Sequence, residues 1–176
     1  ALKQCQIVKE KLQTKFPEIK FEIREISTTG DRERDKKFSE INTEGIFVRE
    51  IEIALLEGEI DLAVHSFKDL PTKLPANLEV AAVIDRANPL DVLAGAADKL
   101  AELPQGAKLG TGSLRRKSQL LAYRPDLEII PIRGNIESRL QKIKSQNLDG
   151  VILAAAGLER LGLKDQITEY LSPEIC

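Results

Sequence analysis

The sequence predicts an α/β protein of two small domains, each with a mostly parallel or mixed sheet flanked by helices. Three observations support this fold class. Short apolar segments alternate along the chain with amphipathic segments of helical period. Several apolar segments end abruptly in polar or glycine residues, as strands do at the ligand-binding edge of an open α/β sheet. A polar, proline-containing break divides the alternation into residues 1–85 and 86–176.

The composition fits a compact folded protein and narrows its function. The 176 residues are 42% hydrophobic and 31% charged, which is enough apolar material for a core. A net charge of −2 and an aromatic content of 4% do not fit a nucleic-acid-binding protein. No segment has the length of a membrane span, and the start has no signal-peptide pattern. With one histidine and two cysteines we expect no metal site, no disulfide framework and a reducing, cytoplasmic setting.

The first half predicts helices and strands in alternation. The expected elements are a helix at 1–15, a strand at 21–26, a helix at 46–57, a strand at 60–65 and a strand at 78–84. Asn42 or Thr43 can cap the second helix, and Gly58 suits its end. Residues 21–65 therefore predict one βαβ unit with a right-handed crossover. The charged stretch between its first strand and its helix predicts a mobile polar loop over residues 31–44.

The second half repeats the alternation. We expect strands at 91–94, 107–109, 127–132 and 151–154, helices at 98–103, 114–123 and 136–145, and a helical C-terminal end. The short helix is ended by Pro104, and Ser113 and Asn135 are good N-caps for the two longer helices.

Polar residues follow the apolar run at 60–64 and make the first candidate site. His65, Ser66, Lys68 and Asp69 are expected at the carboxyl end of a buried inner strand, which Pro71 terminates. A carboxylate beside an ammonium group there can perform acid–base chemistry or hold a polar ligand. The alternative is a solvated turn after a strand.

Two arginine-bearing turns in the second half predict an anion site. The segment GTGSLRR at 110–116 lies between a strand and a helix, so Arg115 and Arg116 fall in the first helical turn, where the helix dipole disfavours cations. An anionic ligand would compensate; alternatively, both side chains extend into solvent. Arg133 and Arg139 repeat the arrangement around the next helix start. Four guanidinium groups suggest a ligand with several carboxylates or phosphates.

Small residues end the last predicted strand, in the segment VILAAAG at 151–157. Either a large ligand approaches the backbone near Ala154 and Gly157, or the helix packs tightly on the sheet. Neither a P-loop nor a G-x-G-x-x-G motif is present, and no Ser-His-Asp triad has a readable spacing.

Three long motifs together resemble the porphobilinogen deaminase (hydroxymethylbilane synthase) family: HSFKDLP at 65–71, GTGSLRR at 110–116 and RGNIESRL at 133–140. The segments TTGD at 28–31, GIFVRE at 45–50 and LAAAGL at 153–158 resemble it as well. The resemblance covers essentially all 176 residues in order, and implies most of domain 1 (1–85) and all of domain 2 (86–176).

The resemblance implies an enzyme that joins four porphobilinogen units head to tail, with release of ammonia, into the linear tetrapyrrole of porphyrin and haem biosynthesis. It implies two domains like those of type II periplasmic binding proteins with the active cleft between them, and a third domain whose cysteine carries a dipyrromethane cofactor. The implied partners are porphobilinogen and the growing polypyrrole, with no nucleic acid and no membrane, and the expected state is a cytoplasmic monomer.

The resemblance also implies residue roles. Asp69 matches the catalytic aspartate, which hydrogen-bonds pyrrole nitrogens and stabilises the cation formed as ammonia leaves. Lys68 and Ser66 match neighbouring cofactor and substrate contacts. The residues that match holders of acetate and propionate side chains are Thr111, Ser113, Arg115, Arg116, Arg133 and Arg139, and we expect Ala154 and Gly157 beside the ligand.

The chain departs from the family pattern in several places. Glu44 stands where the family has a lysine, and Glu40 where it often has one. From the resemblance we expect that the first strand, the returning strand of domain 1 and the third domain are not among these 176 residues. Neither Cys5, expected to pack on a helix face, nor Cys176 is the cofactor cysteine, so the chain alone should be inactive. Two alternatives stay open at this point: a non-catalytic polycarboxylate-binding module of periplasmic-binding-protein type, and a structural or regulatory remnant.

Overall fold

A computed structural model of the chain describes residues 2–27 and 48–176. The chain splits into two compact units, Ala1–Asp85 and Arg86–Cys176. The polar loop predicted at 31–44, with its expected mobility and the proposed caps Asn42 and Thr43, lies outside the described residues.

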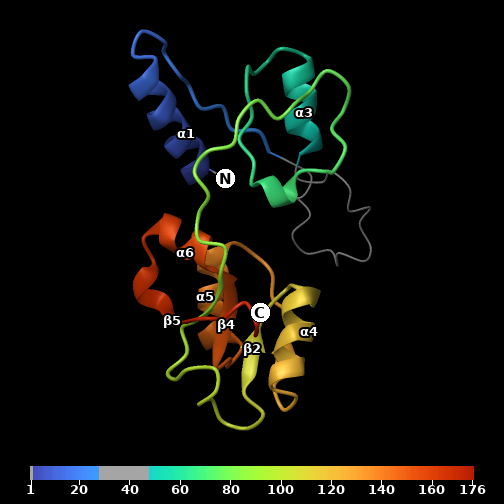
Figure 1. Ribbon diagram of the computed structural model, residues 1–176, viewed down its shortest axis with the longest axis vertical. Coiled ribbons are helices and arrows are strands. Elements are labelled where there is room, and N and C mark those ends of the chain that lie inside the picture. Colours follow the sequence, from blue (N-terminus) through green and yellow to red (C-terminus); the bar gives the residue numbers. More distant parts are fainter. Residues whose placement is uncertain (1, 28–47) are drawn as a thin grey trace. The chain divides into compact units, whose positions relative to one another are not determined.

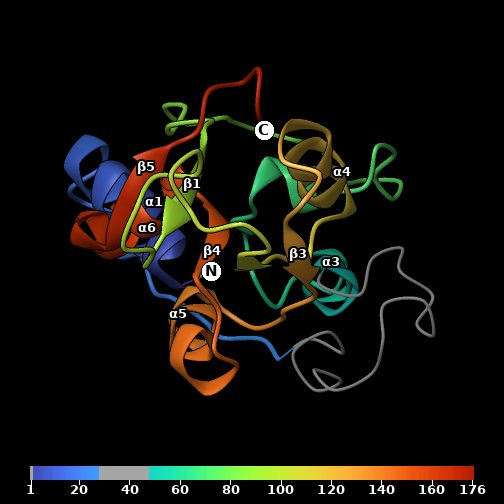
Figure 2. The same ribbon diagram turned by 90° about the horizontal axis from the view of Figure 1, so that it is seen from below.

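The second unit is built on a five-stranded mixed sheet with the order β3-β2-β4-β1-β5. Its strands are β1 (Asp91–Ala94), β2 (Lys108–Gly110), β3 (Glu128–Ile130), β4 (Gly150–Ala154) and β5 (Ile167–Tyr170). β2 runs parallel to β3 and β4, whereas β1 runs antiparallel to β4 and β5. Figure 1 shows β2, β4 and β5, and Figure 2 shows all but β2 by label. The predicted α/β class with a mixed sheet flanked by helices is confirmed.

Helices cover both faces of this sheet. They are α4 (Leu114–Tyr123), α5 (Ile136–Ser145) and α6 (Ala155–Leu161). Leu120 of α4 packs with Leu93 on one face, and Leu140 of α5 and Leu158 of α6 pack with Val92 on the other. Leu93 and Val92 are consecutive in β1, so their side chains point to opposite faces of the sheet. Figure 2 shows α4 and α5 on opposite sides of the strands.

α4 and α5 begin and end at the residues predicted from the sequence. The Ser113 hydroxyl accepts a hydrogen bond from the Arg116 backbone N–H (3.4 Å), and the Asn135 side chain accepts one from the Ser138 N–H (2.8 Å). Each cap satisfies a backbone donor that the first helical turn leaves without a partner.

The helix predicted at 98–103 is wrong. The segment forms a single turn, in which the Leu103 N–H donates to the Lys99 carbonyl (3.1 Å). The Arg124 guanidinium instead donates hydrogen bonds to the carbonyls of Leu100 (2.9 Å) and Leu103 (3.3 Å), and it forms an ion pair with Asp126 (2.7 Å). The segment is therefore held by a side chain from the end of α4 rather than by its own helical hydrogen bonds.

The prediction of a helical C-terminal end is also wrong beyond α6. That helix ends at Leu161, because Gly162 takes a left-handed conformation with φ of 74°. Residues Ile167–Tyr170 then add β5 to the free edge of β1. An edge strand that is only half-buried gives a weak alternation, and four residues are too few to separate it from a helical period.

The first unit contains α1 (Leu2–Lys15), α3 (Arg49–Leu56) and the short 3₁₀ turn η2 (Phe67–Asp69). Both predicted helices are confirmed where the structure describes them. Gly58 follows α3 with a φ of 70°, and the Glu59 N–H closes the end by donating to the Ala54 carbonyl (2.9 Å). Across the described residues of both units, no helix is long and apolar enough to cross a membrane.

The strands predicted at 21–26, 60–65 and 78–84, and with them the βαβ unit, are wrong within the described residues. These segments have no regular secondary structure and form no ladder with one another. Periodicity reports on one segment, whereas a strand also needs a neighbouring backbone to pair with. A side-chain contact links the segment at 21–26 to the residue before the segment at 60–65: the Arg24 guanidinium pairs with the Glu59 carboxylate (2.6 Å) and donates to the Glu59 carbonyl (3.1 Å).

Candidate functional site

The strand ends of the second unit converge on one edge of its sheet. β2, β3 and β4 are parallel, so the turns that follow them lie at the same edge. β1 runs the other way, so its first residue, Asp91, comes to this edge and pairs in register with Ala154, the last residue of β4. The sheet therefore places a carboxylate among the turns that carry the predicted arginines.

The turn after β2 is fixed by its own polar groups. Thr111 is buried, its N–H donates to the Ile130 carbonyl (3.0 Å), and its hydroxyl accepts from the Ser113 N–H (3.3 Å). A Cβ at Gly112 would lie 2.6 Å from the Ile132 carbonyl oxygen, so only glycine fits there. The predicted residues Thr111 and Ser113 are thus part of a rigid turn that aims the start of α4.

Arg115 and Arg116 share one carboxylate. An Nη2 atom of each lies 2.6 Å from a different oxygen of Asp91. The sequence left two alternatives for these arginines, an anionic ligand or extension into solvent, and neither describes this arrangement. A carboxylate of the protein itself compensates the positive charges in the first turn of α4. Sequence reasoning missed Asp91; its only signal was an acidic residue at the start of an apolar strand.

Asp91 stays ionised although it is buried. Burial raises the pKa of its carboxyl group, but the hydrogen bonds and charges of Arg116 and Arg115 outweigh burial and hold the pKa below its usual value. The Cys176 thiol lies 3.6 Å from the same carboxylate. Burial and the Asp91 charge raise the pKa of that thiol, so Cys176 is a poor nucleophile at neutral pH.

Positive charge at this edge exceeds what Asp91 neutralises. Arg139 donates from Nε to the Gly134 carbonyl (2.8 Å), and burial together with the like charge on Arg116 lowers its pKa. The Arg116 Nε–H is buried without a hydrogen-bond acceptor among the described residues. Half-buried Arg133 lies on the turn before α5, where its carbonyl accepts from the Lys142 ammonium (3.1 Å). The edge is therefore suited to anionic groups.

Gly157 has a packing role in the structure. A Cβ at this position would lie 2.5 Å from Cδ1 of Ile136, so the glycine lets α6 approach the start of α5. This supports the packing alternative for the small-residue segment. A binding role for Gly157 and for Ala154, which lies beside Asp91, stays a prediction.

In the first unit, the candidate residues Ser66, Lys68 and Asp69 lie on and just before η2. The Asp69 N–H donates to the Ser66 carbonyl (2.8 Å), and the Ser66 hydroxyl accepts from the Gln4 amide of α1 (3.0 Å). Lys68 and Asp69 are exposed on the turn. The predicted inner strand before them is not formed, but the turn carries an ammonium group and a carboxylate at consecutive exposed positions.

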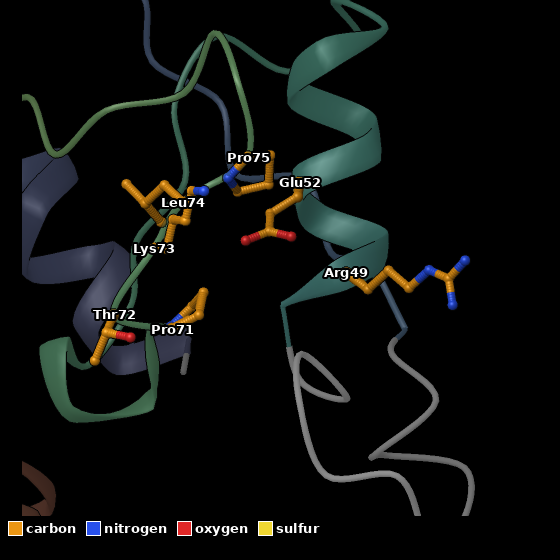
Figure 3. A pocket seen from close by; sticks show the side chains of 7 residues that line it. All are labelled: Arg49, Glu52, Pro71, Thr72, Lys73, Leu74 and Pro75. Atoms are coloured by element: carbon orange, nitrogen blue, oxygen red, sulfur yellow. The ribbon is translucent and has the colours of Figure 1, made fainter.

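A pocket of about 420 Å³ lies between α3 and the segment after η2 (Figure 3). Its lining residues are Arg49, Glu52, Pro71, Thr72, Lys73, Leu74 and Pro75. The Glu52 carboxylate points from α3 toward that segment, whereas Arg49 points away from it. Oε1 of Glu52 is buried and lacks a hydrogen-bond partner in the described part of the chain. No cluster of His, Cys, Asp or Glu that could hold a metal occurs among residues 2–27 and 48–176.

His65 should titrate below the ordinary histidine value of 6.5. Burial lowers its pKa, and the negative charges of Glu52 and Asp69 raise it by less. A pKa lowered on folding means that the unfolded chain binds the proton more readily, so stability is full above 6.5 and falls as the pH drops through the lowered value. His65 is the one histidine of the sequence, so an NMR titration assigns the midpoint directly. A midpoint at or above 6.5 would contradict the described burial.

The second unit belongs to the class of α/β domains with a mixed sheet, in which ligands typically bind at the carboxyl edge of the strands. A family model described as "Porphobilinogen deaminase, dipyromethane cofactor binding domain" matches residues 1–176. The chain belongs to the porphobilinogen deaminase family. The resemblance found in the sequence motifs is therefore confirmed.

Curated relatives agree with the family model. The chain is 52% identical to "Porphobilinogen deaminase" of Syntrophomonas wolfei over 172 residues, which are 97% of this chain and 56% of the relative. It is 47% identical to the protein of the same name from Geobacter metallireducens (99% and 55%) and 51% identical to that of Natranaerobius thermophilus (99% and 57%). The chain therefore spans little more than half the length of these relatives.

Proposed function

We propose that this chain is the part of a hydroxymethylbilane synthase that holds the substrate and carries the catalytic carboxylate. The reaction is the stepwise head-to-tail condensation of four porphobilinogen units with release of ammonia. The observation that carries the proposal is the arginine-rich edge around Asp91 in a chain of this family. Porphobilinogen bears an acetate and a propionate group, so a growing chain of such units needs several cationic partners.

The arginines of the second unit are proposed to hold these carboxylates. Guanidinium groups bind carboxylates in charge-assisted, often bidentate hydrogen bonds. Burial and the like charge on Arg116 lower the pKa of Arg139, and a bound anion nearby would offset that repulsion. The full proposed set is Thr111, Ser113, Arg115, Arg116, Arg133 and Arg139, with Ala154 and Gly157 beside the ligand.

Asp69 is proposed as the catalytic residue. Its exposed carboxylate on η2 can accept hydrogen bonds from pyrrole N–H groups. As ammonia leaves porphobilinogen, positive charge develops on the pyrrole methylene system, and a fixed carboxylate nearby stabilises it. Lys68 and Ser66 are proposed to contact the same ligand from the same turn.

The donors of this chain fit the dipyrromethane cofactor named by the family model. The cofactor carries acetate and propionate groups, and the excess positive charge near Arg116 and Arg139 suits them. When bound, the cofactor supplies the primer to which porphobilinogen units are joined. Cys176 is buried beside Asp91 with a raised pKa, and half-buried Cys5 lies on α1, so we propose that the attachment cysteine belongs to another part of the whole protein.

We further propose that residues 1–85 and 86–176 correspond to an incomplete domain 1 and to domain 2 of a fold like that of type II periplasmic binding proteins. The mixed α/β sheet of the second unit and the greater length of the relatives support this. The proposed setting is a cytoplasmic monomer. A solved structure of the whole protein tests the domain assignment.

The decisive experiment is porphobilinogen turnover by the whole protein, together with titrations of residues 1–176. We expect the whole protein to consume porphobilinogen and release ammonia, and the chain alone to bind porphobilinogen without turnover. Affinity should fall as the ionic strength rises from about 50 to about 500 mM, because salt screens the arginine charges. Equal affinity for porphobilinogen and succinate without any turnover would favour a polycarboxylate-binding module. Salt-insensitive binding would contradict the arginine roles.

A further inference from the structure

Arg115 and Arg116 are consecutive in sequence, yet their surroundings differ. The Arg115 side chain is 56% exposed, and its second anchor is the Gln119 side-chain oxygen, 2.6 Å from Nη1. The Arg116 side chain is only 11% exposed, and its Nη1 lies 3.3 Å from the Ile152 carbonyl. Of the two arginines, only Arg115 therefore has a side chain that is largely accessible to a ligand in solution.

Asp91 is the group that produces this difference. It is 5% exposed and lies at the start of a central strand, so the sheet fixes its position. Its carbonyl accepts from the Leu171 N–H (2.9 Å) on one side, and it pairs in register with Ala154 on the other. One carboxylate oxygen contacts Arg116; the other contacts Arg115 and lies 3.6 Å from the Cys176 thiol. The flexible arginine side chains are thus held by a rigid acceptor.

We infer that Asp91 is a positioning residue, which holds the Arg115 guanidinium at the ligand-binding edge and neutralises buried Arg116, so that of the two only Arg115 contacts a ligand carboxylate. Arg116 then fixes the Asp91 carboxylate from beneath the site. The inference rests on the proposed function and divides the work of two residues that the sequence motif treats alike.

Charge balance explains why one carboxylate serves both tasks. Two guanidinium groups share a single negative charge, so one positive charge remains to attract the ligand. Without Asp91, the two like charges would repel, and exposed Arg115 would move into solvent because buried Arg116 cannot. A ligand would then meet a mobile Arg115 and lose part of its binding energy to ordering that side chain.

The test is a double-mutant cycle in the whole protein, read from porphobilinogen kinetics. Asp91→Asn is expected to raise KM about tenfold and to change kcat less than about threefold. Arg115→Gln should raise KM by a similar factor, and the double variant should resemble Arg115→Gln alone, because Asp91 acts through Arg115. An unchanged KM in Asp91→Asn, or effects that multiply in the double variant, would overturn the inference.

Asp126→Asn is the matched control. Asp126 also pairs with an arginine, Arg124 (2.7 Å), but beside Gly106 at the opposite edge, where β2 and β3 begin. This variant should lower the unfolding temperature without changing KM, which separates positioning from a purely structural effect. An equal rise of KM in Asp126→Asn would assign the Asp91 effect to stability and overturn the inference.

Two additions keep the outcome decisive. If Asp91→Asn does not fold, Asp91→Glu retains the charge and displaces the carboxylate by one methylene group. Its KM should still rise several-fold, and an unchanged KM would overturn the inference. The same variants are titrated with succinate as an anion probe. If the wild type does not turn over porphobilinogen, only the proposed reaction is contradicted. If the substitutions at Asp91 and Arg115 affect succinate affinity independently of each other, the inference is contradicted.

Discussion

Replacing Asp69 with asparagine in the whole protein is expected to lower kcat for porphobilinogen by about 100- to 1,000-fold. Asparagine keeps the shape of the side chain and part of its hydrogen bonding but carries no negative charge. Stabilisation of the cation formed as ammonia leaves is therefore lost, whereas binding of the ligand carboxylates by the arginines remains. KM should change little, because the lost interaction is strongest in the transition state.

The chain offers a matched control for this substitution. Asp61 is an exposed aspartate of the same unit, eight positions before Asp69 and outside the HSFKDLP motif. Asp61→Asn should retain kcat within about twofold, since surface substitutions away from a site have small effects. If Asp69→Asn kept more than about half of the wild-type kcat, the proposed catalytic role of Asp69 would be wrong. A different carboxylate would then have to stabilise the cation.

Replacing Leu93 with alanine is expected to lower the free energy of unfolding of the second unit by about 2–5 kcal/mol. Leu93 is 0% exposed in central strand β1 and packs in a cluster with Leu100, Leu120 and Ile152. Removing its branched end leaves a cavity that a rigid sheet with a helix on it cannot fill. Urea unfolding of residues 1–176 measures the loss. Both tyrosines of the chain, Tyr123 and Tyr170, lie in this unit, so their fluorescence reports on its unfolding alone.

Leu114→Ala makes the same chemical change at an exposed position. Leu114 is the first residue of α4 and is 81% exposed. Its replacement should change the free energy of unfolding by less than about 0.5 kcal/mol. Equal losses for the two variants would show that β1 does not lie at the centre of the core.

Local signals predicted the elements whose causes are local. Ser113 and Asn135 cap α4 and α5, and the apolar residues behind each cap recur at helical spacing, so both helices begin and end as expected. The same holds for Gly58, which ends α3 with a positive φ. In each case the information needed lies within one turn of the element itself.

Elements that depend on distant partners could not be predicted in this way. Residues 60–65 have the composition of a buried strand, but no other described segment pairs with them. Conversely, Ile167–Tyr170 has a weak pattern and becomes a strand because β1 leaves an edge for it. Pairing is decided by the neighbour, which periodicity within a segment does not contain.

The candidate site shows the same limit. The motif GTGSLRR placed Arg115 and Arg116 correctly at a strand-to-helix turn, because glycines and a capping serine mark such turns. The carboxylate that pairs with them comes from a strand that is antiparallel to β4 and starts more than twenty positions earlier in the chain. Only the fold brings Asp91 to that edge, so its part in the site could not be inferred from spacing.

The position of β1 also bears on how the second unit matures during protein synthesis. β1 is made first, but its hydrogen-bonding neighbours are β4 and β5, which are made last. While the ribosome adds the residues between them, Val92, Leu93 and Ala94 have no sheet to join, and an unpaired apolar strand invites association with other nascent chains. Closure of the sheet therefore waits for nearly the whole unit to emerge, and a chain cut before Ile167 would leave β1 exposed along one side.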